Sequence, residues 1–232
     1  MKEILNNYVE HSFGELKQAE FKFKQFEYNY KKYFPEDKNA FVLDVGIGSG
    51  EMLSCMKKWG YVNYLGIDVS SSTVNFCKSQ DLNCLLVQNA TEWLNNHKEK
   101  FSLITVIDVL EHIPKQETIL FLKAIKERMK KRGILLLQVP NLQAPDGQLH
   151  RYNDFTHEIG YVEHSLQQVI MAAGFDNVKF YGFETFEYPR WKRIIKIFRW
   201  VFWKCITFAR LINGNLHPKI LHPVFFVVAM KD

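Results

Sequence analysis

The stretch Phe-Val-Leu-Asp-Val-Gly-Ile-Gly-Ser-Gly occupies residues 41–50 and decides the fold. Its apolar residues predict a buried strand. The glycines that follow predict a tight turn, because glycine has no Cβ and lets the backbone approach a ligand closely. A second apolar run ends at Asp68, 18 residues after Gly50. A carboxylate at the tip of a neighbouring strand accepts hydrogen bonds from ribose hydroxyls in nucleotide-binding sheets. Together the two runs predict a pocket for an adenosine-bearing ligand.

The spacing of the glycines separates two classes of ligand. Dinucleotide-binding turns read G-x-G-x-x-G and present a helix N-terminus to a pyrophosphate. This turn reads G-x-G-x-G and follows a carboxylate, Asp44, inside the strand. A carboxylate at that place suits a cationic ligand better than a diphosphate. The alternative is an ordinary strand–turn–helix that needs its glycines only for the turn.

These residues resemble the first two motifs of the class I S-adenosylmethionine-dependent methyltransferases. The resemblance implies S-adenosylmethionine as the cofactor, which carries a sulfonium and an amino group, and S-adenosylhomocysteine as the product. It also implies that the motif residues contact the cofactor: Asp44, Gly46, Gly48, Gly50, Asp68 and Val69.

Strand-like runs alternate with helix-like runs, which predicts an α/β fold with a parallel sheet covered on both faces. We expect strands at 41–45, 63–67, 84–88, 103–107, 133–139, 177–186 and 223–230. We expect helices at 51–59, 72–79, 91–96, 116–131 and 165–173, with hydroxyl caps from 70–73 and with Gly133 closing the fourth. The resemblance implies a Rossmann-like seven-stranded methyltransferase sheet, mostly parallel with an antiparallel C-terminal strand.

The 232 residues suit one domain with appendages. Residues 1–34 are rich in aromatics and predict a helical cap that packs on the domain, and 35–187 form the S-adenosylmethionine-binding core. Residues 188–222 are a basic, aromatic insertion, and 223–232 hold the final core strand. Four cysteines without metal-ligand spacing indicate reduced, buried thiols, and we find no signal peptide or membrane-spanning run. We therefore expect a cytoplasmic protein.

Polar residues also follow the third predicted strand, whose carboxyl end meets the ends of its neighbours at one edge of the sheet. Asn89-Ala90 stands where related methyltransferases place an Asp that binds the adenine amino group. The side-chain carbonyl of Asn89 could accept from the same amine. The resemblance therefore implies adenine contacts at Asn89 and Ala90.

The fourth predicted strand ends in Asp108-Val109-Leu110-Glu111-His112-Ile113-Pro114, which is similar to the fourth motif of many small-molecule methyltransferases. The similarity implies that Asp108, Val109 and His112 line the cofactor. A solvated turn before a helix is the alternative for Glu111 and His112. The motifs of nucleobase methylation, Asn/Asp-Pro-Pro-Tyr and Pro-Cys, are absent from the sequence. We therefore expect no nucleic acid as substrate.

The loop after the fifth predicted strand carries the densest set of acid–base groups. It reads Val139-Pro140-Asn141 and, further on, His150-Arg151-Tyr152-Asn153-Asp154-Phe155-Thr156-His157-Glu158-Ile159-Gly160-Tyr161. With the later S-L-x-x-V-I-x-x-A-G-F run, this loop resembles methyltransferases encoded with bacterial surface-polysaccharide genes. That resemblance implies a hydroxyl of a sugar or phosphorylated sugar as acceptor, on a nucleotide-linked or lipid-linked precursor of capsule or lipopolysaccharide. It also implies substrate binding by Asn141, Arg151 and Tyr152.

A sugar hydroxyl must lose its proton as the carbon–oxygen bond forms, and a neutral imidazole is a suitable acceptor near neutral pH. We predict His157 as the general base, with Asp154 orienting it or binding a sugar hydroxyl, and His150 as the second candidate. The alternative is a structural histidine that pins the loop. We expect no metal site, because His150, Asp154 and His157 have no clear further ligand in the rest of the chain.

Residues 190–204 alternate cations with Trp, Phe and Ile at roughly helical spacing, and from 188 to 231 there are nine Lys or Arg and no Asp or Glu. Three interpretations stay open. The helix packs its apolar face on the domain or on a second subunit of a homodimer; it lies peripherally at the inner face of a membrane; or it binds the phosphates of a nucleotide- or lipid-linked sugar. Nucleic-acid binding is not expected, since no other basic surface supports it.

The sequence thus predicts an S-adenosylmethionine-dependent methyltransferase that acts on a sugar hydroxyl in surface-glycan biosynthesis. A small-molecule O- or N-methyltransferase of another pathway is the first alternative. The alternative from a different class is a non-catalytic, methyltransferase-like module that docks on a membrane or a glycan enzyme.

Overall fold

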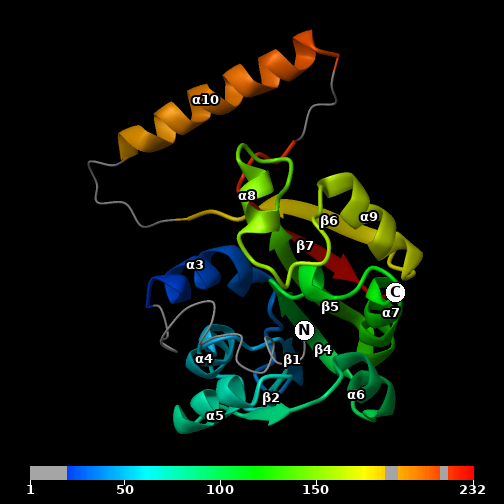
Figure 1. Ribbon diagram of the computed structural model, residues 1–232. Coiled ribbons are helices and arrows are strands. Elements are labelled where there is room, and N and C mark those ends of the chain that lie inside the picture. The colour runs from blue at the N-terminus through cyan, green and yellow to red at the C-terminus, as the bar shows by residue number, and fades with distance from the viewer. Residues whose placement is uncertain (1–19, 186–192, 215–218) are drawn as a thin grey trace.

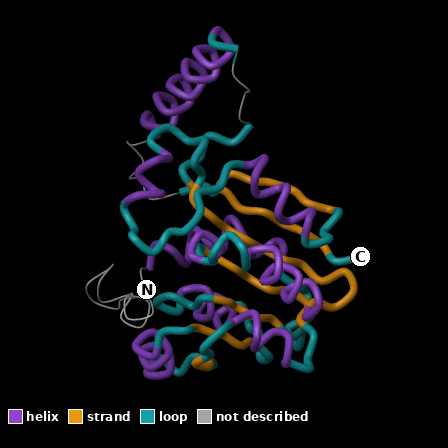
Figure 2. Tube along the Cα trace, turned by 45° about the vertical axis from the view of Figure 1, so that its right-hand side comes forward, coloured by secondary structure: helices purple, strands orange, loops and turns teal. Residues whose placement is uncertain are grey.

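The computed structural model describes residues 20–185, 193–214 and 219–232. They form one seven-stranded sheet with helices around it, in the strand order β3-β2-β1-β4-β5-β7-β6 (Figure 1, Figure 2). The strands are β1 (Val42–Val45), β2 (Tyr64–Asp68), β3 (Cys84–Leu86), β4 (Phe101–Ile107), β5 (Met129–Pro140), β6 (Asn177–Gly182) and β7 (Val224–Met230). β1 to β5 pair in parallel, and β7 pairs antiparallel with both β5 and β6. The predicted fold class is confirmed, including the antiparallel C-terminal strand.

The helices connect the strands and cover both faces of the sheet. They are α3 (Glu20–Tyr30), α4 (Glu51–Lys58), α5 (Ser71–Ser79), α6 (Ala90–Asn96), α7 (Thr118–Arg128), α8 (Gly147–Tyr152), α9 (Glu163–Ala172) and α10 (Arg193–Ile212), with short 3-10 turns η1 (Lys31–Tyr33) and η2 (Leu110–His112). The predicted cap of α5 is present, since the Ser70 hydroxyl accepts from the Thr73 N–H at 3.3 Å. Gly174 follows α9 in the left-handed conformation (φ +93°), as a helix-ending glycine does.

Two apolar cores lie on opposite faces of the sheet. The first contains buried side chains of α6, α7 and α9, such as Leu94, Phe121 and Ile170. The second contains buried side chains of α3, α4 and α5, such as Tyr30 and Leu53. β1 is buried on both faces, which explains why it reads as a continuous apolar run rather than an alternating one.

The boundary between the fourth predicted helix and the fifth predicted strand was wrong. We expected a helix to residue 131 closed by Gly133, but α7 ends at Arg128 and β5 begins at Met129. Met129 pairs with Phe101, and both side chains are fully buried. Burial of this pair outweighs the local signal of the basic run at 130–132, whose residues are exposed. The pairing is irregular after Phe101, and Arg132 adopts a left-handed backbone (φ +60°).

Helix α3 lies across the sheet edge at which β1, β2 and β4 end (Figure 1). The Tyr30 hydroxyl donates a hydrogen bond to the side-chain oxygen of Gln138 in β5. Asn29 exchanges two hydrogen bonds with the backbone of Glu184, at 2.9 and 3.0 Å. Residues 20–34 therefore pack on the domain as predicted, and residues 1–19 of the expected N-terminal cap lie outside the described part of the chain.

Helix α10 stands apart from the sheet in both views (Figure 1, Figure 2). It lies in the expected basic insertion, of which residues 186–192 and 215–218 are outside the described ranges. Its described contacts with the core include a 2.9 Å hydrogen bond from Arg210 to the carbonyl of Gln143 and a ring contact between Trp203 and His222 at 4.8 Å. Among the described residues, we find no helix with the length and apolar character needed to cross a bilayer.

Candidate active site

A cavity of about 630 Å³ opens where β1, β2 and β4 end, and α3 forms its opposite wall. This is the edge of an open parallel sheet at which ligands bind, because the loops after adjacent strands meet there. Its volume lies within the range of small-molecule sites. The motifs read from the first, second and fourth strands converge in this cavity: Asp44, Gly46, Gly48, Asp68, Val69, Asp108, Val109 and His112 all line it.

The glycine turn needs glycine for two different reasons. Gly46 has φ +78°, and a Cβ placed on it would lie 2.2 Å from the Cγ2 atom of Val109. The loop after β1 therefore touches the loop after β4 with no room for a side chain. Gly48 also has a positive φ (+50°), but a Cβ there would meet nothing within 4 Å. Gly50, which also has a positive φ (+78°), starts helix α4.

Asp68 is held at the end of β2 by backbone donors. Its Oδ2 accepts from the N–H of Ile47 at 2.9 Å, and its Oδ1 accepts from the N–H of Ser70 at 2.8 Å. Burial raises the pKa of Asp68, and the hydrogen bonds from these N–H groups oppose that rise. Each carboxylate oxygen retains lone pairs for a further donor. Asp68 is thus built to receive hydroxyl groups from within the cavity.

Asp44 is buried in β1 with 1% of its surface exposed. Its Oδ1 accepts a 2.6 Å hydrogen bond from the Thr105 hydroxyl of β4. Burial nevertheless raises the pKa of Asp44 to about 7, with smaller contributions from the negative charges of Asp68 and Glu51. A cation bound nearby would favour the ionised form of this carboxyl group.

Asp108 follows β4 with a left-handed backbone (φ +52°) that turns its carboxylate into the cavity. Both carboxylate oxygens lie 3.0 Å from Nε2 of Gln138, the residue that also accepts from Tyr30. The surrounding protein raises the pKa of Asp108, although the side chain is accessible from the cavity.

The charge of the cavity lining favours a cationic ligand. Besides the carboxylates of Asp44, Asp68 and Asp108, the lining includes Glu51, whose Oε1 is paired with Lys22 at 3.2 Å. Lys22 is the one Lys or Arg among the described lining residues. A surplus of carboxylates in a partly enclosed space attracts positive charge, as a sulfonium and an amino group supply.

The predicted adenine contacts at Asn89 and Ala90 lie outside the group that lines the cavity. The side-chain oxygen of Asn89 accepts from the N–H of Glu92 at 3.0 Å and thereby caps helix α6. The acceptor that we reserved for the adenine amine is therefore engaged within the protein. Contact of these two residues with adenine stays a prediction.

His157, the predicted general base, does not line the cavity but contacts a residue that does. Its ring contacts that of His112, a lining residue, with a centroid distance of 4.7 Å. Its Nδ1 lies 2.6 Å from the carbonyl oxygen of His150. The backbone of His150 thus orients the His157 ring. Nε2 of His157 lies 4.0 Å from Oδ2 of Asp154, the carboxylate that we predicted to orient it.

Asp154 also accepts hydrogen bonds from Thr156, which in turn contacts His112. Its Oδ1 accepts from the N–H and the hydroxyl of Thr156, at 2.8 and 2.7 Å. The Thr156 hydroxyl in turn lies 2.8 Å from Nδ1 of His112. Burial, aided by the nearby positive charge of His157, lowers the pKa of His112 to about 4, so this imidazole is neutral at physiological pH. The catalytic roles of His157, Asp154 and His150 stay predictions.

The three predicted substrate-binding residues have other partners in the structure. Asn141 is fully buried, and its amide donates to the carbonyls of Ile220 and His222 at 3.0 and 2.9 Å. Arg151 donates to the carbonyl of Glu158 at 3.2 Å, and Tyr152 is exposed on α8. None of Asn141, Arg151 and Tyr152 belongs to the described cavity lining.

The sequence did not indicate two parts of the cavity wall. Helix α3 supplies Phe21, Lys22, Gln25 and Phe26, and the segment around the antiparallel strands supplies Phe183, Thr185 and Val224. Both lie far in sequence from the glycine turn and carry no motif. The aromatic richness of residues 1–34 was the one available signal, and it indicated packing rather than a cavity wall.

The comparisons with known proteins agree with this geometry. Residues 19–179, more than half of the chain, match the family described as "Methyltransferase domain". The chain belongs to this family. The protein is therefore a methyltransferase of class I, and the carboxylate-lined cavity at the glycine turn is our predicted cofactor site.

Relatives of this methyltransferase include a ubiquinone biosynthesis O-methyltransferase of Glaesserella parasuis, which is 31% identical over 112 residues, or 44% of this chain and 46% of the relative. The chain spans less than half the length of the curated relatives it matches. Among solved structures, a SAM-dependent methyltransferase from Archaeoglobus fulgidus has a TM-score of 0.70 at 19% identity and covers 97% of this chain and 98% of its own. A phosphoethanolamine N-methyltransferase 2 from Haemonchus contortus, in complex with S-adenosyl-L-methionine, has a TM-score of 0.59 at 14% identity, over 98% of this chain and 60% of its own.

S-adenosylmethionine is the cofactor of this methyltransferase, and the residues present fit it. The cofactor supplies an electrophilic methyl group on a positively charged sulfur. Asp68 offers acceptors for two hydroxyl groups, Asp44 and Asp108 offer negative charge, and Gly46 leaves the backbone of its turn without a side chain. Side chains of α3 form the opposite wall of this cavity.

Proposed function

We propose that this methyltransferase transfers the methyl group to a hydroxyl of an apolar small molecule, and that α10 holds the enzyme against an anionic membrane surface. The first part rests on the described relatives, which are named as O-methyltransferases of ubiquinone biosynthesis. It rests also on the cavity wall. Phe21, Phe26, Phe183 and Val224 offer an apolar, largely aromatic surface beside the carboxylates.

The sugar hydroxyl predicted from the loop at 150–161 receives less support. The side-chain amide of Asn141, which we expected to bind the sugar, donates hydrogen bonds to the backbone carbonyls of residues 220 and 222. Arg151 and Tyr152 lie outside the cavity lining. The relatives and neighbours described above carry no glycan in their names. An apolar acceptor is the function that the cavity wall favours.

Acceptor panels separate the two substrate classes. The full chain is incubated with S-adenosylmethionine and either an alkyl-substituted catechol or nucleotide-linked sugars, and S-adenosylhomocysteine and the methylated product are quantified by mass spectrometry. We expect O-methylated catechol. Turnover with nucleotide-linked sugars and none with the catechol would overturn the proposed apolar acceptor and favour the predicted sugar acceptor.

The second part rests on the surface of α10. Its exposed apolar side chains include Ile197, Phe198, Trp200, Phe202 and Phe208. The helix carries five Lys or Arg and no Asp or Glu. Cationic helices with Trp and Phe on an apolar face bind in the interface of anionic bilayers, since charge attraction and apolar burial act together. The predicted packing of this face on the domain does not occur for these side chains. Pairing with a second subunit is the competing interpretation.

Vesicle flotation tests the membrane part. The full chain is expected to float with vesicles that contain anionic phosphatidylglycerol and less with neutral phosphatidylcholine vesicles. The double variant Phe198→Ser/Phe202→Ser, which keeps the charge, is expected to lose most of this flotation. Phe155→Ser removes a phenylalanine outside α10 that is more exposed than Phe198 and Phe202, and it serves as the control. Two results would contradict membrane docking. One is unchanged flotation of the double variant; the other is a stable dimer of the parent chain that the double variant does not form.

A further inference from the structure

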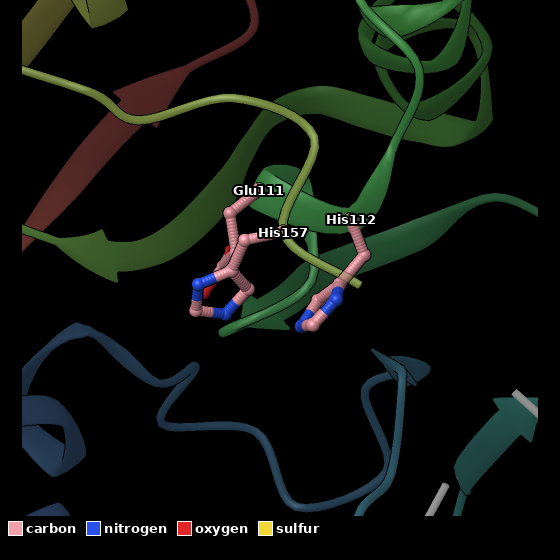
Figure 3. Close-up of side chains that lie close together, drawn as sticks. All are labelled: Glu111, His112 and His157. Atoms are coloured by element: carbon pink, nitrogen blue, oxygen red, sulfur yellow. The ribbon is translucent and has the colours of Figure 1, made fainter. Parts of the chain in front are cut away.

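Three side chains beside the cofactor cavity form a cluster that the sequence did not reveal. Glu111 and His112 lie in the short turn η2 after β4, and His157 comes from the loop that follows α8 (Figure 3). One potential ligand atom from each residue lies within 4.8 Å of the other two. His112 lines the cofactor cavity, while Glu111 and His157 line a small adjoining hollow. Figure 3 shows the two imidazole rings turned toward each other, with the Glu111 carboxylate behind the His157 ring.

The loop is held on η2 by backbone bonds. The N–H groups of Glu158 and Ile159 donate to the carbonyl oxygen of Glu111, at 2.7 and 3.2 Å. These bonds fix His157 relative to η2. The cluster is therefore set by the fold and not by side-chain rotation alone.

In each imidazole ring, the hydrogen bond made by Nδ1 determines which nitrogen carries the proton. A carbonyl oxygen only accepts, so Nδ1 of His157 must carry the proton in its 2.6 Å contact with the carbonyl of His150. In the neutral ring, Nε2 of His157 then carries a lone pair.

The same reasoning holds for His112. The Thr156 hydroxyl donates its proton to Oδ1 of Asp154 at 2.7 Å, so it accepts from Nδ1 of His112 at 2.8 Å. Nε2 of His112 then carries the lone pair. Histidines that bind metals are oriented in this way, with the second nitrogen donating to a carbonyl or to a relay that ends in a carboxylate.

Glu111 supplies an independent observation. Its side chain is 2% exposed, and neither carboxylate oxygen has a hydrogen-bond partner among the described residues. A buried carboxyl group without a donor is costly, and a bound cation would satisfy it. The solvated turn that was the alternative for Glu111 is therefore wrong.

We propose that Glu111, His112 and His157 bind one divalent metal ion of the zinc or manganese class at the wall of the cofactor cavity. One carboxylate with two imidazoles suits such ions better than Mg²⁺ or Ca²⁺, which prefer oxygen ligands throughout. Three protein ligands leave coordination positions for an oxygen of the acceptor.

This inference rests on the proposed hydroxyl methylation and gives the metal a role in it. A metal ion lowers the pKa of a coordinated hydroxyl group. The acceptor hydroxyl would lose its proton to water, and its oxygen would attack the methyl carbon. The carbon–sulfur bond would break with its electron pair left on sulfur, which yields the neutral thioether S-adenosylhomocysteine. As a ligand, His157 would position the metal and would not act as the base that we predicted.

Manganese binding tests the site directly. The full chain is treated with a chelator, dialysed and titrated with Mn²⁺, and free Mn²⁺ is followed by electron paramagnetic resonance. One site is expected, with binding weakened at least about tenfold in Glu111→Gln and in His157→Ala. Glu158→Gln removes the charge of an exposed carboxylate next to His157 and is expected to bind as the parent does. Zn²⁺ is expected to displace the bound Mn²⁺.

Titration of S-adenosylmethionine into each variant shows whether it still folds around its cofactor. If Glu111→Gln did not fold, metal binding by the parent would be compared with that of His157→Ala alone. No Mn²⁺ or Zn²⁺ binding, or equal binding by the parent and the cluster variants, would overturn the metal site while leaving the methyl transfer intact. Metal binding at the cluster without methylation of any apolar hydroxyl would instead overturn the proposed function.

Discussion

Asp44→Asn is expected to change how the stability of the cofactor-free protein depends on pH. Burial raises the pKa of Asp44 from 3.8 to about 7. As the pH rises above about 4, the unfolded chain releases this proton while the folded protein retains it. The free energy of unfolding therefore falls through this window and levels off above pH 7. A pKa difference of about three units corresponds to a loss of about 4 kcal/mol by pH 8.

Urea unfolding from pH 5 to pH 8, at constant ionic strength and without cofactor, measures this effect. The free energy of unfolding of Asp44→Asn minus that of the parent is expected to rise over this range by up to about 3 kcal/mol and to flatten above pH 7. Asp81→Asn is the control. Asp81 is exposed, and its pKa is lowered by a hydrogen bond from Lys57, so it is ionised in both states over the whole range. A difference for Asp44→Asn that stays constant from pH 5 to pH 8 would refute the buried, protonated carboxyl group.

The remaining predictions concern close contacts around the cavity. Gly46→Ala is expected to lower the free energy of unfolding by more than Gly48→Ala does. Both variants lose about 1–2 kcal/mol because alanine is strained in a left-handed backbone, but Gly46→Ala also places its Cβ 2.2 Å from Cγ2 of Val109. Urea unfolding compares the two variants, and equal losses would contradict the close approach. Tyr30→Phe leaves Gln138 without its buried donor and is expected to cost about 1–3 kcal/mol in the same assay, whereas a loss below about 0.5 kcal/mol would show that this bond is not formed.

The sheet and the glycine turn could be predicted because their signals are local. An apolar run, alternate glycines and a carboxylate at the next strand tip lie within residues 41–68. Each signal has a physical cause in its own residue, such as the missing Cβ of Gly46. The antiparallel direction of the C-terminal strand came from the resemblance rather than from local pattern.

The side chains brought together by tertiary contacts could not be predicted in the same way. Glu111 and His157 are separated by 46 residues, and only the docking of the loop on η2 makes them neighbours. At two residues, the side chain has a hydrogen-bond partner within the protein that the sequence did not predict. The Asn89 side chain caps a helix, and the Asp154 carboxylate accepts from Thr156. A polar residue at a strand end has several partners within reach, and its sequence position does not say which one it takes.

The measurement that tests the central claim most directly is a calorimetric titration of S-adenosylmethionine into the full chain and into Asp68→Ala. We predict one binding site in the parent. In the variant, we expect binding weakened by at least about tenfold, since two hydrogen bonds to a charged acceptor are lost. Circular dichroism confirms that the variant is folded. The absence of binding heat in the parent, or equal affinity in Asp68→Ala, would contradict the assignment of the cavity as the cofactor site.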